Sequence, residues 1–148
     1  MAGPATQTVS KCVEDLRAHL QSIAAFKNKH LFVYHEDDLQ DKLKGITLPG
    51  AGVIYEGMRA LPEAGGAKIG LSAELVFSLL VVSRPETLAN VDSKTPLLNI
   101  LDDVRNSILF SRSPTGHKWR FVVEAATRET HGAIFWVQRW STTVQLTQ

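Results

Sequence analysis

Two stretches in which side chains alternate in character constrain what this chain can fold into. In residues 71–82, LSAELVFSLLVV, every second side chain is apolar, and in residues 134–146, IFWVQRWSTTVQL, Trp136 and Trp140 fall on one face. A period of two is that of a β-strand, so both stretches are predicted to be long strands. The face of the second strand that carries the two tryptophans is expected to point into the core.

The second face of the first strand changes character along its length. It starts polar, with Ser72 and Glu74, and ends apolar, with Leu80 and Val82. Such a strand is expected to leave a solvated region and to become covered on both faces. The cover would be either a helix of the same chain or a neighbouring subunit.

Two amphipathic helices are predicted to accompany these strands. Between residues 9 and 26, apolar side chains recur at steps of three and four, which places them on one helical face. Residues 97–109, LLNILDDVRNSIL, repeat this pattern. They follow Thr95, a favoured N-cap residue, and Pro96, which suits the first helical position.

The remaining elements are shorter. Strands are expected at residues 30–35, 52–58 and 119–125, with one helical turn at residues 37–45. This order of elements favours an α+β fold, a mainly antiparallel β-sheet with two long amphipathic helices packed on one face. The length of 148 residues suits one domain. We expect residues 1–8 to form a flexible tail and residues 9–148 a single α+β domain.

The composition argues against several classes of protein. A net charge of +1 gives no strong attraction to nucleic acid or membrane. The N-terminus lacks the pattern of a secretory signal, and the longest apolar run is far shorter than the roughly 20 residues that span a membrane. The one cysteine excludes an internal disulfide and fits a reducing compartment. We expect a soluble, cytoplasmic protein without sequence-specific nucleic-acid recognition.

No set of reactive side chains matches a catalytic or metal-binding pattern. Cys12 lies about two helical turns from His19, too far for a nucleophile–base pair, and is expected to be buried. The acidic cluster at residues 35–38, HEDD, lacks the spacing of an EF-hand loop. The basic and aromatic residues 117–120, HKWR, are expected to belong to a core strand rather than to stack on bases. We predict no catalytic residue, no metal ion and no cofactor, and a protein that is not an enzyme.

The order of elements resembles that of the tail terminator, or tail completion, proteins of long-tailed bacteriophages and of related minor tail or neck proteins. The likeness covers most of residues 9–146. It is carried by the helix at residues 9–26, the long strand at 71–82 followed by Ser83-Arg84-Pro85, the capped helix from Thr95 to Leu109, the strand at 119–125, and the terminal strand FWVQRWSTTVQL.

The resemblance implies a structural protein of a virion. Such proteins are α+β subunits that close into a hexameric ring, cap the tail tube, stop its polymerisation and offer a joining surface to the head. The implied partners are further copies of the chain, the tail tube protein and a head-completion or neck protein. The implied location is the virion tail, after assembly in the host cytoplasm. The polar loops at residues 59–67 and 84–94 are then candidate contact surfaces, with partner contacts at Arg59, Glu63, Arg84 and Glu86.

Two other interpretations stay open. One is a small cytoplasmic α+β ligand-binding module or enzyme with a pocket between the sheet and the helices, which would be a monomer or a dimer. The other is a different head–tail connector or tail assembly protein, which would also form oligomers. Oligomer size separates the first from a tail terminator, and the position in the virion separates the second.

Overall fold

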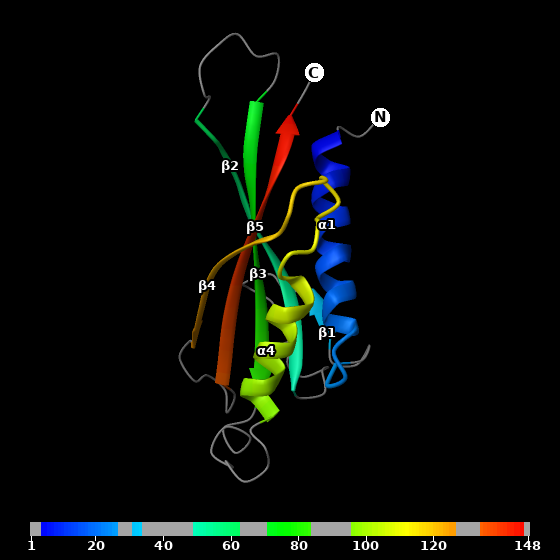
Figure 1. Ribbon diagram of the computed structural model, residues 1–148, viewed down its shortest axis with the longest axis vertical. Helices are drawn as coiled ribbons and strands as arrows, with labels where there is room; N and C mark the ends of the chain where they lie inside the picture. Colours follow the sequence, from blue (N-terminus) through cyan, green and yellow to red (C-terminus); the bar gives the residue numbers. More distant parts are fainter. Residues whose placement is uncertain are drawn as a thin grey trace.

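The computed structural model of the chain describes residues 4–26, 31–33, 49–62, 71–83, 96–126 and 134–146 (Figure 1). Its elements, in chain order, are α1 (Pro4–Gln21), β1 (Leu31–Val33), β2 (Gly50–Ala60), β3 (Leu71–Ser83), α4 (Pro96–Ile108), β4 (Arg120–Ala126) and β5 (Ile134–Leu146). The helical turn predicted at residues 37–45 lies outside the described residues.

The strands form one five-stranded sheet in the order β1-β2-β3-β5-β4. Only the short strand β1 runs parallel to its neighbour; the other described pairs are antiparallel. The predicted α+β fold with a mainly antiparallel sheet is therefore confirmed. Strands β3 and β5, the two alternating stretches of the sequence, pair from Leu71 opposite Leu146 to Ser83 opposite Ile134. They form the centre of the sheet, which explains why both are long and largely apolar.

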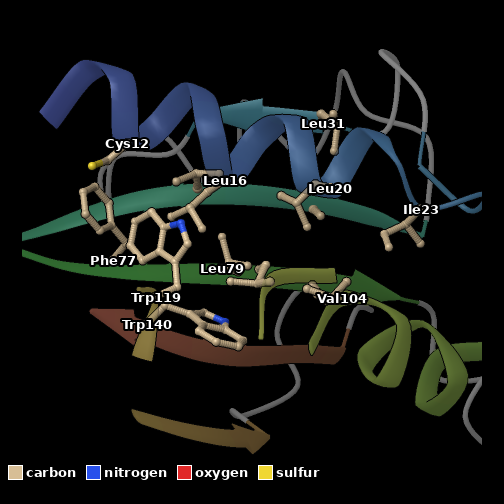
Figure 2. Close-up of a cluster of buried hydrophobic side chains, with 14 of the residues drawn as sticks. Cys12, Leu16, Leu20, Ile23, Leu31, Phe77, Leu79, Val104, Trp119 and Trp140 are labelled. Atoms are coloured by element: carbon tan, nitrogen blue, oxygen red, sulfur yellow. The ribbon is translucent and has the colours of Figure 1, made fainter. Parts of the chain in front are cut away.

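Both helices pack on the same face of the sheet, here called the inner face. Figure 2 shows Leu16 and Leu20 of α1 lying over Phe77 and Leu79 of β3. The buried side chains of α4 are Ile100, Leu101, Val104 and Ile108, at the three- and four-residue steps of one helical face. Each large apolar side chain that is fully buried contributes about 1.5–3 kcal/mol, so this shared core is the main source of stability.

An aromatic row crosses four strands on the inner face at one level. The register places Tyr55 of β2, Phe77 of β3, Trp140 of β5 and Phe121 of β4 side by side. The ring centroids are 5.2 Å apart for Tyr55 and Phe77 and 5.3 Å apart for Phe121 and Trp140. Trp119 adds an edge-on contact with Phe77 at 5.5 Å. Trp140 is fully buried, which confirms that the aromatic face of β5 points into the core.

Tyr55 and Phe121, the two residues at the ends of this row, are each followed by a β-bulge. The register shifts between Tyr55 and Gly57 in β2, and between Phe121 and Val123 in β4. Glu56 and Val122 are therefore the extra residues. A bulge bends its strand and increases the local twist. Two bulges at the same level, one on each side of β3 and β5, bend the sheet there.

A buried polar network joins α4 to the sheet. Gln138 of β5 has no exposed surface. Its Nε2 donates to the backbone oxygen of Leu101 at 3.0 Å and to Oε1 of Glu124 at 2.8 Å, and its Oε1 accepts a hydrogen bond from the indole of Trp140 at 3.2 Å. Arg105 of α4 donates to the same Glu124 oxygen at 2.9 Å. The amide is satisfied on both sides, which is what a buried polar side chain requires.

The outer face of the central strands is buried at one end. Ser78, Leu80 and Val82 of β3 and Phe135 of β5 are all buried. The change from a polar to an apolar face along residues 71–82 thus marks a strand that is covered on both sides, as predicted. This burial is present in a single chain, so a neighbouring subunit is not required for it.

Helix α1 begins at Pro4, whereas the sequence predicted a helix from residue 9 after a tail over residues 1–8. A proline at the first helical position has its φ angle set for a helix and has no N–H to leave unpaired. The helix also ends earlier than predicted, at Gln21, and turns lead on to Phe26. Strand β2 is longer than the predicted residues 52–58, since β3 offers a partner from Gly50 to Ala60.

Candidate functional site

The outer face of the sheet carries an open groove with a volume of about 460 Å³. This outer groove is lined from four strands, by Glu56, Gly57, Met58, Arg59, Glu74, Val76, Val122 and Arg139. The helices lie on the other face, so a ligand or partner can reach it directly. We take it as the candidate functional site.

Two ion pairs flank the outer groove. Arg59 Nη2 lies 3.0 Å from Glu74 Oε2, between neighbouring strands. Arg139 Nε of β5 lies 2.8 Å from Glu56 Oε2 of β2, across the intervening strand β3. The acidic and basic groups neutralise each other in pairs, and partly exposed pairs of this kind contribute about 0–1 kcal/mol each. The groove therefore offers a charge-balanced rim around the apolar side chains of Val76 and Val122.

The two bulges place side chains in this groove. Glu56 and Val122 are the extra residues of β2 and β4, and both line it. Gly57, next to the first bulge, has a φ of 125°, a conformation that favours glycine. Apart from Gly57 itself and its two chain neighbours, no heavy atom lies within 4 Å of the position that a Cβ would take there. The bulge thus leaves open space beside Val76, its partner in β3.

The structure brings one of the four predicted contact residues to this groove. Arg59, predicted as part of a polar loop, lies in strand β2 with 73% of its side chain exposed. Glu63, Arg84 and Glu86 lie outside the described residues, as does most of both predicted contact loops.

Sequence reasoning missed Glu56, Glu74 and Arg139. A signal for two of them was present: Glu74 and Arg139 are the only charged residues within the stretches 71–82 and 134–146. Each occupies the face opposite the buried apolar side chains. A lone charge on the outer face of a long apolar strand needs a partner or solvent, so a search for paired charges between strands could have found them.

The strand that borders the outer groove is itself poorly covered. β4 is an edge strand of the described sheet, and its consecutive residues Phe121, Val122 and Val123 are 40–48% exposed. Exposed apolar side chains on an edge strand mark a surface that another chain can cover.

A second exposed apolar feature lies at the end of α4. Phe110, the second residue after the end of the helix at Ile108, is 76% exposed and has a φ of 69°. A helix often ends with one residue in this left-handed conformation, but glycine normally occupies it. A bulky residue there costs about 1–2 kcal/mol. Phe110 and the preceding Leu109, which is also exposed, form what we call the α4 knob.

A polar cluster joins α1 to the end of α4. His19 Nδ1 lies 2.8 Å from Ser107 Oγ, and His19 Nε2 lies 3.4 Å from Ser111 Oγ and 3.7 Å from Asp15 Oδ2. The same Asp15 oxygen accepts a hydrogen bond from the Trp119 indole at 2.8 Å. Histidine, serine and aspartate do meet here, but the carboxylate is held by Trp119 and the ring connects two helices. The arrangement fits a structural clamp between α1, α4 and the start of β4.

Cys12 is fully buried, as the sequence predicts, and lies beside the core aromatic rings (Figure 2). Burial, with a smaller effect from the negative charge of Asp15, raises the pKa of its thiol to about 12. The side chain is therefore a thiol near neutral pH. Since the thiolate is the nucleophile and the metal ligand, Cys12 acts as a small apolar core residue.

Within the described ranges, no three histidine, cysteine, aspartate or glutamate residues gather as a metal ion would need. No described helix is long and apolar enough to cross a membrane.

Comparisons with other proteins show the fold. No protein family matches the chain, and no curated protein matches it. Among solved structures, the chain is similar to a chain from the structure entitled "Virion of native gene transfer agent (GTA) particle", with a TM-score of 0.58 and 13% sequence identity. The similarity covers 97% of this chain and 99% of that chain. The two chains therefore share a fold.

Proposed function

We propose that this protein is a structural protein of a virion, and more specifically a tail terminator. In this role, copies of the chain form a ring that caps the finished tail tube, stops its polymerisation and joins it to the head or neck. The partners are further copies of the chain, the tail tube protein and a head-completion or neck protein.

The observation that carries the proposal is the end-to-end structural similarity to a chain of a gene transfer agent virion. A similarity that spans both chains means that the whole domain, rather than a common subdomain, is shared. The exposed apolar edge strand, the open outer groove and the α4 knob add support, because a subunit that assembles needs apolar surface to bury. The resemblance to tail terminators supports the more specific role.

A ligand-binding module finds less support. Ligand pockets are concave and enclose most of the ligand, with a few unpaired polar groups that fix its orientation. The outer groove is open, and its charged side chains are engaged in ion pairs with each other.

The test is the mass of the purified protein by light scattering after size exclusion, alone and mixed with the tail tube protein from the same source. A hexamer, or a monomer that forms a ring-sized complex at tube ends, supports the terminator role. Electron microscopy of the mixture then tests the terminator role against that of a neck or connector protein, because a terminator is expected to sit directly on the tube end. A protein that stays monomeric, ignores tubes and binds a small ligand would overturn the proposal.

A further inference from the structure

Phe110 combines two unfavourable features, and the end of α4 accounts for its left-handed turn but not for a bulky, exposed side chain at that position. Its backbone has a φ of 69°, where glycine is preferred, and 76% of the residue faces solvent. Strain of this kind is retained where the surrounding structure or a functional contact requires it. An exposed phenylalanine gains nothing from the strain until another surface covers it.

The outer groove is a surface of the right kind. Its volume of about 460 Å³ is large enough for an aromatic side chain. Its apolar part, Val76 and Val122 beside the open space at Gly57, suits an aromatic ring.

The α4 knob and the outer groove lie on opposite faces of the sheet. The knob follows α4, which packs on the inner face, whereas the groove is formed on the outer face. The knob of one chain therefore does not reach the groove of the same chain. A net charge of +1 means that copies of the chain do not repel each other strongly.

We propose that the α4 knob of one copy docks in the outer groove of a second copy. The partner is a second copy of this chain. The inference rests on the proposed function, because the docked knob would be the contact between neighbouring subunits of the ring. A contact between two different surfaces is called heterologous. When each subunit binds the next in the same head-to-tail way, the subunits form a closed ring if the rotation between neighbours divides a full turn evenly. The knob supplies the aromatic anchor, and the ion pairs of Arg59 and Arg139 form the polar rim.

The first experiment is disulfide cross-linking of Phe110→Cys mixed with Val122→Cys under a mild oxidant. The native Cys12 is buried and does not interfere. The matched control mixes Leu98→Cys with Val122→Cys, because Leu98 is an exposed residue of α4 that belongs to neither surface. The knob–groove mixture is expected to form a heterodimer at least about tenfold faster than the control, since contact raises the effective concentration of the two thiols. Equal rates in the two mixtures would overturn the proposal.

Cross-linking of each cysteine variant with itself tests the two other possible contacts, edge to edge and knob to knob. Fast cross-linking of Val122→Cys with itself would indicate that two β4 edges pair, and would overturn the proposal in favour of edge-to-edge association. Fast cross-linking of Phe110→Cys with itself would indicate two knobs in contact and would overturn it equally.

A second experiment uses variants that keep the fold. Phe110→Gly removes the knob and relieves the backbone strain, so it is expected to weaken self-association at least about tenfold without loss of thermal stability. Val122→Glu places a charge in the groove and is expected to do the same. Leu98→Ala is the control and should associate as the unaltered chain does.

Mixing the Phe110→Gly and Val122→Glu variants tests directly whether the contact joins two different surfaces. Phe110→Gly retains an intact groove and Val122→Glu retains an intact knob, so one docked contact remains possible between them. The mixture is expected to form a one-to-one dimer that does not grow further. A mixture that remains monomeric although the unaltered chain associates would contradict a heterologous contact.

Failure of this inference and failure of the proposed function have different signatures. If the chain caps tail tubes but the knob and groove cysteines react no faster than the control pair, the subunit contact lies elsewhere. If the cysteines react but the chain ignores tubes, the docking stands and the terminator role does not.

Discussion

At the scale of single residues, two side chains carry unusual chemistry without being reactive. Cys12 is a buried thiol with a raised pKa, and Phe110 is an exposed aromatic residue in a conformation that favours glycine. Cys12 packs in the core as a small apolar side chain. Phe110 retains backbone strain at the protein surface. Both can be tested in the isolated chain.

Cys12 should be unreactive in the folded protein and should make stability pH-dependent only at high pH. Burial raises its pKa from 9.0 to about 12. Because the folded state holds the proton more tightly, this contribution is fully present below about pH 9 and is lost as the pH rises through about 12. Thiol labelling near pH 8 should be slow in native protein and fast in urea. Between about pH 9 and 12, Cys12→Ala should lose less stability than the unaltered chain; an identical decline would show that the thiol is not responsible.

The backbone strain at Phe110 predicts that two small substitutions will differ in their effect on stability. Glycine adopts a φ of 69° without steric cost, whereas alanine retains a Cβ and therefore the strain. Phe110→Gly should unfold with a free energy about 1 kcal/mol higher than Phe110→Ala. Urea denaturation of both variants measures this difference. Equal stabilities would mean that the backbone at this position relaxes without a penalty.

At the scale of secondary-structure elements, polar contacts determine how the helices sit on the sheet. α4 is joined to β5 and β4 by the network around Gln138, and to α1 by the cluster around His19. The apolar core holds the layers together, while these directional contacts select one arrangement of the helices. Buried networks of this kind are costly when only part of them is satisfied.

Replacing Gln138 by leucine should be strongly destabilising despite the similar size. The Trp140 indole would lose its partner inside the protein, and the Leu101 carbonyl and Glu124 would each lose a donor. Leaving buried polar groups unpaired costs about 1–3 kcal/mol. Gln145→Leu, on the same strand but exposed, should change the free energy of unfolding by less than about 0.5 kcal/mol. Similar losses for both variants in chemical denaturation would argue against the network.

The clamp between α1 and α4 should appear as a coupling between His19 and Ser107. Their side chains are 2.8 Å apart although the residues are far apart in the sequence. A double-mutant cycle of His19→Ala and Ser107→Ala should give a coupling energy of about 0.5–1.5 kcal/mol in unfolding. Additive losses would show that the two helices are joined by apolar packing alone.

At the scale of the whole molecule, the distribution of surfaces suggests assembly by burial of apolar area. The knob and the apolar part of the groove are on opposite faces, and the groove charges are already paired within the chain. Assembly through such surfaces differs from assembly through the charged loop contacts Glu63, Arg84 and Glu86, which stay predictions.

Self-association should therefore depend little on salt. Raising the ionic strength from about 0.05 to about 0.5 M screens charges between subunits but leaves apolar burial in place. Sedimentation velocity at the two concentrations should give association constants within about threefold of each other. A loss of about tenfold or more at the higher salt would point instead to charged contacts between subunits.

Local patterns in the sequence determined the elements and the core-facing side chains. Alternation over residues 71–82 and 134–146 predicted β3 and β5, and the pattern after Thr95 and Pro96 predicted α4, because side-chain period and capping depend on neighbours in the chain. The tryptophan face of β5 followed from the same alternation.

Tertiary structure alone decided the strand order, the bulges at Glu56 and Val122, the network of Gln138 and the left-handed conformation of Phe110. Each depends on a partner distant in the sequence or on how a helix meets the sheet. The outer groove is lined by two bulges that lie at one level on separate strands, and the pairing register that brings them together cannot be predicted from a local sequence pattern.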